Sequence, residues 1–316
     1  MKWNKRLNGV LLLTIFFSCF ELSAQDPIPV KTKTDTNHGP VIPCKEMRIV
    51  MSFVNVDNPM PDTFRKAADN IIEDSQLSLS SFWEKMSAMD RPIRVVHIGD
   101  SHVRGHIFPY VMRKLLEDDF GHDAVIDYQV NYWSPGLATE TGKAGIVYHI
   151  LGVNGATFGS YNTPERIHSI TKLNPDLIVV SFGTNEAHRR NYRMGEHVAE
   201  MNKLFADLKK ACPNAAYLMT TPPGAYIRSG RRKIINKRTP KVVDTEISFA
   251  RQHGVAIWDL YSVIGGKDYG CKNWTAAKMF QHDKIHFTQA GYTLQGLLFH
   301  EAFIKAYNDY VASQLN

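Results

Sequence analysis

Five short apolar runs, each followed by a helical pattern, constrain the fold of this chain more than any other feature. The runs cover residues 93–98, 145–151, 176–182, 215–220 and 255–260. Helical periodicity follows them over residues 105–118, 164–173, 194–211, 240–253 and 288–310. Strands that alternate with helices form parallel sheets that are covered on both faces. The sequence therefore predicts an α/β fold with a five-stranded parallel sheet.

Polar residues follow the first three runs directly. Asp100 and Ser101 end the first, Gly155 lies just after the second, and Asn185 follows the third. In open parallel sheets, functional groups gather at the carboxyl ends of the strands. We therefore expect these residues to share one edge of the sheet.

Residues 1–24 have the organisation of a secretory signal peptide. Lys2, Lys5 and Arg6 precede an apolar run over residues 10–20, and Ala24 stands before the expected cut. That run is shorter than the about 20 residues that a membrane-spanning helix needs, and no later window is long enough. We predict an exported mature chain, periplasmic or secreted, with a buried N-terminal helix as the alternative.

Ser18 and Cys19 at the end of the apolar run allow a second form of export. A bacterial lipoprotein would be cut before Cys19 and lipidated on it. Phe16 and Phe17 fit such a cleavage site poorly. Cleavage after Ala24 is favoured, and a lipid anchor at Cys19 remains the alternative.

Residues 25–90 differ in pattern from the rest of the chain. Residues 25–43 are rich in Pro, Thr, Lys and Asp, which is typical of a linker. Residues 49–56 could form a short strand, and residues 63–89 show helical spacing. We expect a linker and then one or two helices that brace a main domain over residues 91–316.

The cysteine and histidine pattern gives no support for a zinc ribbon or a thioredoxin-like centre, and the net charge is only mildly basic. The net charge is +6, and loss of three basic residues and one acidic residue with the leader leaves 6 − 2 = +4. Cys44, Cys212 and Cys271 would remain, an odd number that leaves their pairing open. No Cys-x-x-Cys occurs, and His102 and His106 lack a third zinc ligand nearby. We predict no metal and no cofactor.

The segment 99–102, Gly-Asp-Ser-His, indicates a nucleophile. A serine on a tight turn between a strand and a helix is exposed, but it needs a base because its hydroxyl is a weak nucleophile. The best candidate base is His286, just before the last helix, with Asp283 three residues upstream. That spacing lets the carboxylate hold the imidazole in the required tautomer. Ser101, His286 and Asp283 are therefore the predicted catalytic residues.

Acyl transfer also needs donors for a developing oxyanion. We expect the backbone N–H groups of Ser101 and Gly155 and the side-chain amide of Asn185 to supply them. Gly152 and Gly159 lie close to Gly155 in the sequence and are alternatives for the second donor.

These residues lie in four blocks: Gly-Asp-Ser, Asn-Gly-Ala-Thr, Gly-Thr-Asn-Glu and Asp-x-x-His. In order and spacing, the blocks resemble those of the SGNH (GDSL-like) hydrolases over residues 93–310. The resemblance implies a flavodoxin-like three-layer α/β/α sandwich, a hydrolase domain over residues 91–316, and ester hydrolysis through an acyl-serine without metal. It places the family's serine, glycine, asparagine, histidine and aspartate on Ser101, Gly155, Asn185, His286 and Asp283.

Two residues depart from the commonest family pattern. His102 stands where many members carry Leu, and Glu186 follows Asn185 where Asp is commoner. Both resemble the branch that includes exported bacterial peptidoglycan O-acetylesterases and related carbohydrate esterases. The catalytic set is unchanged by them.

Some candidate substrate contacts lie outside the blocks. Residues 228–241 hold seven basic residues and no acid, so Arg231 and Arg232 could clamp an anionic substrate, although a solvated loop is the plainer interpretation. Tyr132 and Trp133, in the polar insertion 127–141, could shape an acyl or glycan pocket, as could His102. The basic stretch has too few aromatic residues to favour nucleic-acid binding.

The sequence therefore predicts an exported SGNH-type serine esterase, with a small acyl group, acetyl above all, on carbohydrate or peptidoglycan as its substrate. A lysophospholipase or arylesterase, or an acyltransferase, could use the same serine. A glycan-binding envelope protein with a vestigial site is the alternative outside enzymes.

Overall fold

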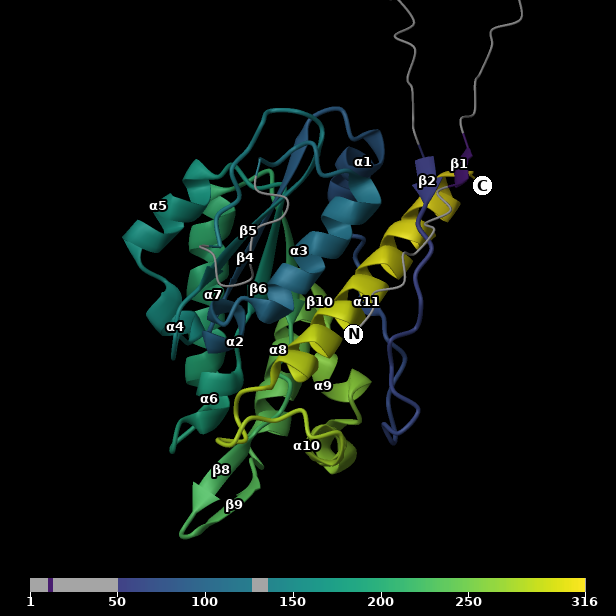
Figure 1. Cartoon of the computed structure of the whole chain (residues 1–316). Coiled ribbons are helices and arrows are strands. Elements are labelled where there is room, and N and C mark those ends of the chain that lie inside the picture. Colours follow the sequence, from purple (N-terminus) through teal and green to yellow (C-terminus); the bar gives the residue numbers. More distant parts are fainter. Residues whose placement is uncertain (1–10, 14–50, 127–135, 316) are drawn as a thin grey trace, which may run out of the picture.

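A six-stranded sheet forms the centre of the molecule, in the order β3-β10-β7-β6-β4-β5 (Figure 1). The computed structural model describes residues 11–13, 51–126 and 136–315. Five strands run parallel, and they are β4 (Pro92–Gly99), β5 (Gly145–Gly152), β6 (Leu177–Ser181), β7 (Ala216–Thr220) and β10 (Ala256–Trp258). The predicted α/β fold with five parallel strands is confirmed.

The sixth strand, β3 (Ile72–Glu73), was not predicted. It pairs antiparallel with β10, with Trp258 opposite Ile72. The helical spacing over residues 63–79 is misleading, because turns and β3 occupy this segment and the helix α1 begins only at Ser80. Of the helical pattern predicted over residues 63–89, the part from Ser80 to Ala88 forms a helix, whereas the prediction is wrong for residues 63–79.

Contacts with residues far along the chain explain why residues 63–79 do not form a helix. The backbone N–H of Ala68 donates to the carbonyl of Ser262 (3.2 Å), and the buried amide of Asn70 donates to the carbonyl of Leu298 (2.7 Å). The indole of Trp258 donates to the Asn70 side chain (2.8 Å). Tertiary hydrogen bonds thus replace those that a helix would have made.

Helices cover both faces of the sheet. They are α1 (Ser80–Ala88), α2 (Ser101–Arg104), α3 (Ile107–Phe120), α4 (Phe158–Tyr161), α5 (Pro164–Lys172), α6 (Thr184–His188), α7 (Met194–Ala211), α8 (Thr239–His253), α9 (Leu260–Val263), α10 (Gly266–Ala276) and α11 (Gln289–Leu315). Figure 1 shows α3 and α11 on one side and α4, α5 and α7 on the other.

Each face of the sheet has its own apolar core, since successive strand residues point to opposite faces. Val95 faces the core formed with α1, α3 and α11, whereas its neighbour Val96 faces the core formed with α4, α5, α7 and α8. The molecule is therefore a three-layer α/β/α sandwich.

Two small two-stranded sheets lie outside the central one. The strand β2 (Met51–Phe53) pairs with β1 (Leu11–Leu13), and Asn308 of α11 holds the adjacent Val54 through both backbone groups. The strands β8 (Tyr226–Ser229) and β9 (Arg232–Ile235) form a hairpin that projects from the body of the molecule (Figure 1). The basic stretch is thus a hairpin leading into α8 rather than an irregular loop.

Candidate active site

Ser101 is the first residue of α2, directly after the end of β4. The turn requires glycine at position 99, because a Cβ there would lie 2.5 Å from the carbonyl oxygen of Ser181. Asp100 caps α2 by accepting the backbone N–H of His102 (2.8 Å). The sequence Gly-Asp-Ser therefore forms a sharp turn that places Ser101 at the carboxyl edge of the sheet.

A closed turn over residues 280–287 carries the other two predicted catalytic residues. Phe280 and Phe287 pair antiparallel at its base. Lys284 has a left-handed backbone (φ 62°), which lets the chain reverse within a few residues. Asp283 Oδ1 accepts the backbone N–H groups of Ile285 and His286, both at 2.9 Å. These bonds fix the Asp283 carboxylate beside the His286 ring.

The structure brings the three predicted catalytic side chains together. His286 Nε2 lies 2.9 Å from Ser101 Oγ, and His286 Nδ1 lies 2.6 Å from Asp283 Oδ2. Burial alone would raise the pKa of Asp283, but hydrogen bonds from His286 and two backbone N–H groups lower it below its usual value. An ionised Asp283 keeps the proton on Nδ1, so Nε2 is free to accept the serine proton.

The predicted oxyanion donors also lie at this edge. Gly155 has a positive φ of 71°, and Asn185 lies in α6, which begins after Gly183. The Asn185 amide donates to the carbonyl of Ala156 (2.9 Å) and makes a longer contact with Asp100 Oδ2 (3.3 Å). The loops after β5 and β6 are therefore joined through this amide.

A cavity of about 740 Å³ connects these groups. It is lined by Ser101, Arg104, Gly105, Ile107, Asn154, Gly155, Asn185, His188, Gln281, Ile285, His286 and Tyr292. The nucleophile, the base and two oxyanion candidates thus share one cavity. Gly155 lines it, whereas the alternatives Gly152 and Gly159 do not.

Asp100 is buried beneath the nucleophile. Burial raises its pKa to about 8, despite the hydrogen bond from the His102 backbone. At neutral pH the Asp100 carboxyl is therefore mostly protonated. It adds little negative charge beside Asn185, where an oxyanion would form.

His102 lies behind the catalytic histidine rather than on the cavity wall. Its ring is buried, 5.4 Å from the His286 ring between centroids, and Nδ1 contacts the hydroxyl of Tyr292 (3.0 Å). Burial and the nearby His286 lower the pKa of His102 to about 3. The expectation that His102 contacts substrate is corrected, because a buried ring under His286 cannot reach a ligand in the cavity.

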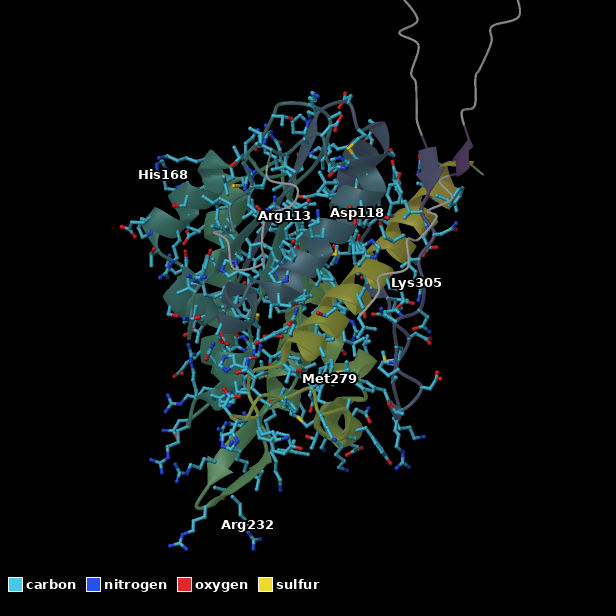
Figure 2. All side chains as sticks on the ribbon, viewed as in Figure 1. Arg113, Asp118, His168, Arg232, Met279 and Lys305 are labelled. Atoms are coloured by element: carbon cyan, nitrogen blue, oxygen red, sulfur yellow. The ribbon has the colours of Figure 1, made fainter. Side chains whose placement is uncertain are left out.

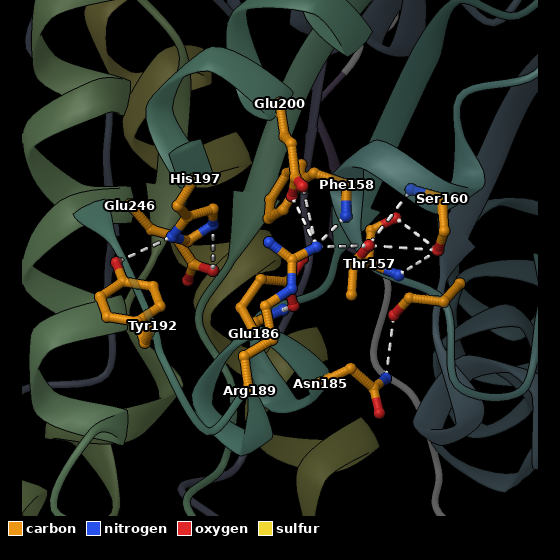
Figure 3. Close-up of polar contacts among 12 residues, drawn as sticks. Thr157, Phe158, Ser160, Asn185, Glu186, Arg189, Tyr192, His197, Glu200 and Glu246 are labelled. Carbon is orange, nitrogen blue, oxygen red and sulfur yellow. Dashed lines mark hydrogen bonds and ion pairs between the residues drawn. The ribbon is translucent and has the colours of Figure 1, made fainter. Parts of the chain in front are cut away.

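Glu186 connects the two loops that carry Gly155 and Asn185. Its carboxyl is fully buried; Oε1 accepts the N–H of Phe158 (2.7 Å) and Oε2 accepts the N–H of Gly183 (3.0 Å). Burial raises its pKa to about 7, although these bonds oppose that shift. One carboxyl group therefore clamps the segments after β5 and β6 together through their backbone N–H groups (Figure 3).

A second buried carboxyl, Glu246, lies near this clamp (Figure 3). It is 3.7 Å from Nε2 of buried His197, and burial raises its pKa well above the usual value. Neither carboxyl oxygen has a hydrogen-bond partner in the described part of the chain. Glu246 therefore holds neither loop through a hydrogen bond, unlike Glu186.

The remaining candidates lie away from the cavity or outside the described residues. Arg231 and Arg232 are at the exposed tip of the β8–β9 hairpin, and Figure 2 shows Arg232 extending away from the body. They do not line the cavity, so their predicted contact with an anionic substrate would lie outside it. Tyr132 and Trp133 fall outside the described residues.

Sequence reasoning missed several residues of the site. Glu186 was noted only as a departure from the family pattern, although Gly183-x-x-Glu186 has the spacing of a capping box. That signal could have predicted its bond to the Gly183 N–H. Tyr292 and His188 reach the cavity from helices, and no local pattern marks them.

No group of three or more His, Cys, Asp or Glu in the described residues could hold a metal ion. Cys212 and Cys271 are buried and unpaired with each other, while Cys19 and Cys44 lie outside the described residues. Among the described helices, none has the length and apolar character to cross a membrane.

Comparison with known proteins identifies the family. A sequence model of the GDSL-like lipase/acylhydrolase family matches residues 98–294. The chain belongs to this family. The predicted SGNH-type esterase assignment is thereby confirmed at the level of the family and its ester-hydrolase class.

One solved structure shows the same fold at low sequence identity, and others are similar to a smaller part of this chain. A peptidoglycan O-acetylesterase superposes with a TM-score of 0.63 at 17% identity, over 77% of this chain and 99% of that one. A lipase/acylhydrolase from Enterococcus faecalis gives a TM-score of 0.45 at 21% identity, over 68% and 96%. An acetylxylan esterase from Geobacillus stearothermophilus gives 0.46 at 15%, over 68% and 94%. No curated protein sequence matches the chain.

Proposed function

We propose that this chain is an exported serine esterase that removes O-acetyl groups from carbohydrate. The hydrogen-bonded series from Ser101 through His286 to Asp283, at 2.9 and 2.6 Å, carries the proposal. Ser101 acts as the nucleophile and His286 as the general base. Asp283 orients His286 and stabilises the imidazolium that forms during attack.

The reaction proceeds in two steps. Ser101 Oγ attacks the ester carbonyl carbon and gives its proton to His286 Nε2, which passes that proton to the departing alcohol. The acyl group then stays on Ser101. Water loses a proton to His286, attacks the acyl carbon and releases the acid, and the proton returns to Ser101.

The tetrahedral oxyanion of each step needs donors. The N–H of Ser101 is at the start of α2, where a helix provides no internal acceptor. The N–H of Gly155 and the amide of Asn185 complete the set. Asn185 can turn one hydrogen from its long 3.3 Å contact with Asp100 to the oxyanion, while it keeps the bond to Ala156.

Several observations support an acetylated carbohydrate as the substrate and an exported location. The family is one of acylhydrolases, and the structural neighbour with the TM-score of 0.63 is a peptidoglycan O-acetylesterase. The charged residues, apolar run and Ala24 at the N-terminus support export. A lipid anchor at Cys19 stays the alternative form of export.

Hydrolysis of p-nitrophenyl acetate, butyrate and longer esters tests the proposal, with wild type, Ser101→Ala and His286→Ala compared. Acetate turnover that is lost in both variants, together with release of acetate from acetylated peptidoglycan or xylan, would support it. Cleavage of long-chain esters with no action on acetylated glycans would favour a lysophospholipase or arylesterase. Transfer of acetyl to an added sugar would indicate an acyltransferase, and no turnover in any protein would indicate a vestigial site.

A further inference from the structure

The β8–β9 hairpin concentrates positive charge beside the cavity. Residues 228–241 contain seven basic residues and no acid. Six of these side chains are exposed, namely Arg228, Arg231, Arg232, Lys233, Lys237 and Lys241. None of the six forms a salt bridge with an acidic residue among the described residues. This hairpin therefore presents uncompensated positive charge to the solvent.

The strand register places like charges against each other. Arg228 lies directly opposite Lys233 in the antiparallel pair, so both side chains are on the same face of the hairpin. Like charges at such positions destabilise a sheet. Arg228 Nε donates to the carbonyl of Gly230 (3.1 Å), and Lys233 Nζ donates to the carbonyl of His282, so neither meets a carboxylate. A ligand with negative charges would remove this repulsion.

The base of the hairpin is hydrogen-bonded to two segments of the active site, the turn over residues 280–287 and the helix α6. The N–H of Tyr226 donates to the carbonyl of Lys284 (2.9 Å), between Asp283 and His286. On the other side, the buried amide of Asn236 donates to the carbonyl of Ala187 in α6, two residues after Asn185. Lys284 and Ala187 are next to residues that line the cavity, so the hairpin is attached at the rim of the cavity.

The face that carries Arg228 and Lys233 is turned toward the segment that holds the catalytic histidine. Tyr226 is on this face, and its ring packs edge-on against Phe280, with centroids 5.7 Å apart. The contact of Lys233 with His282 continues along the same segment. A chain bound on this face would therefore lie beside the entrance to the cavity.

We propose that the β8–β9 hairpin is a docking arm for an acylated polysaccharide that carries carboxylate groups. The guanidinium group matches a carboxylate with two parallel hydrogen bonds, and a row of cations suits a polymer with regularly spaced anions. The arm holds the polymer while one of its esters enters the cavity. This inference rests on the proposed function for the identity of the reacting group, but the binding itself does not require catalysis.

A nucleic acid fits the hairpin less well. Proteins that bind single strands stack bases on several exposed aromatic rings. The hairpin has one aromatic residue, Tyr226, and its ring is occupied by Phe280. The surface is therefore suited to anionic groups without stacked bases.

Binding of polygalacturonate, which carries carboxylates but no acetyl group, tests the docking arm in the wild-type protein. The variant Arg228→Gln/Lys233→Gln should bind roughly three- to thirtyfold more weakly, since each exposed ion pair contributes modestly. The control Lys172→Gln/Lys210→Gln removes the same charge from exposed positions on α5 and α7. It should change binding by less than about twofold. Wild-type binding should weaken as ionic strength rises.

Equal affinities of the two double variants, or binding that salt leaves unchanged, would overturn the proposal. Tighter binding of a single-stranded DNA of matched charge, or binding to anionic phospholipid vesicles but not to polygalacturonate, would also overturn it. Turnover of p-nitrophenyl acetate reports separately on the proposed function. If wild type lacks that turnover, the esterase proposal fails, whereas the polymer-binding result still decides the role of the hairpin.

Discussion

Replacing Glu186 with Gln should disturb the position of one active-site loop and lower kcat, with little change in the free energy of unfolding. The carboxyl accepts the N–H of Phe158 at 2.7 Å and the N–H of Gly183 at 3.0 Å. A glutamine keeps one acceptor and turns an NH2 group toward the other N–H. One loop therefore loses its anchor. The loss of a hydrogen bond that leaves a buried donor unpaired costs about 1–3 kcal/mol.

The same substitution also removes the free-energy cost of burying an ionisable carboxyl group. The pKa of Glu186 is raised from 4.5 to about 7 by burial. Near pH 7 this burial of an ionisable group costs about 3 kcal/mol, since each pKa unit corresponds to about 1.4 kcal/mol. The neutral glutamine avoids that cost. The two effects nearly cancel, so Glu186→Gln should unfold within about 2 kcal/mol of wild type, with no large drop in stability.

Activity should respond differently from stability. Removal of one oxyanion donor typically lowers kcat by about 10²- to 10³-fold, and a displaced donor should have a smaller effect. We expect a fall of roughly ten- to hundredfold in kcat for p-nitrophenyl acetate, with KM nearly unchanged, because the interaction matters in the transition state. Steady-state kinetics and urea unfolding measure the two quantities on the same preparation.

Glu246→Gln is the matched control. Glu246 is equally buried in the same region, but its oxygens hold neither loop. Burial raises its pKa and so favours the neutral carboxyl, for which glutamine is a close replacement. This variant should retain wild-type kcat. If Glu186→Gln keeps wild-type kcat, or if the control loses as much activity, Glu186 does not position the oxyanion donors.

Three further predictions concern the charged groups. Asp283→Asn should lower kcat by about 10²- to 10⁴-fold in the same ester assay, because an amide no longer stabilises the imidazolium; a loss below tenfold would exclude this role. Activity should fall as pH rises through about 8, where ionised Asp100 faces Asn185, and Asp100→Asn should lack this decline; the same decline in both proteins would refute the assignment. The stability of wild type relative to the double variant Asp100→Asn/Glu186→Gln should fall between pH 6.5 and 8, since Asp100 and Glu186 keep protons in the folded state, with pKa values raised to about 8 and about 7, that their unfolded forms have lost. The expected difference between the two slopes in urea unfolding is about 2 kcal/mol per pH unit near pH 7, and a relative stability that rises over this range would contradict the account.

The sequence predicted the features that depend on local pattern. The parallel strands were visible because strands covered on both faces are continuous apolar runs, as residues 177–181 show. Ser101, Asn185 and His286 could be placed at one edge because their blocks follow strand ends or precede the last helix. The distances between their side chains, however, depend on turns such as that at Lys284. Its left-handed backbone could not be predicted, because lysine does not favour that conformation.

Features that depend on long-range contacts could not be predicted. Residues 63–79 have helical spacing, but the Asn70 side chain bonds to Trp258 and α11 instead, which holds the segment along the sheet edge. The burial of His102 depends on Tyr292, almost 200 residues away along the chain. Glu186 joins loops that follow two different strands. Only its bond to the N–H of Gly183, three residues away, had a sequence signal, whereas its bond to the N–H of Phe158 had none.

Labelling with a fluorophosphonate tests the central claim most directly, because this reagent forms a stable bond with an activated serine. Peptide mass mapping of the wild-type protein should find the label on Ser101. Ser101→Ala should take up no label and show no ester turnover, and His286→Ala should be labelled far more slowly. A label on a different residue, or turnover by Ser101→Ala at the wild-type rate, would contradict the serine mechanism.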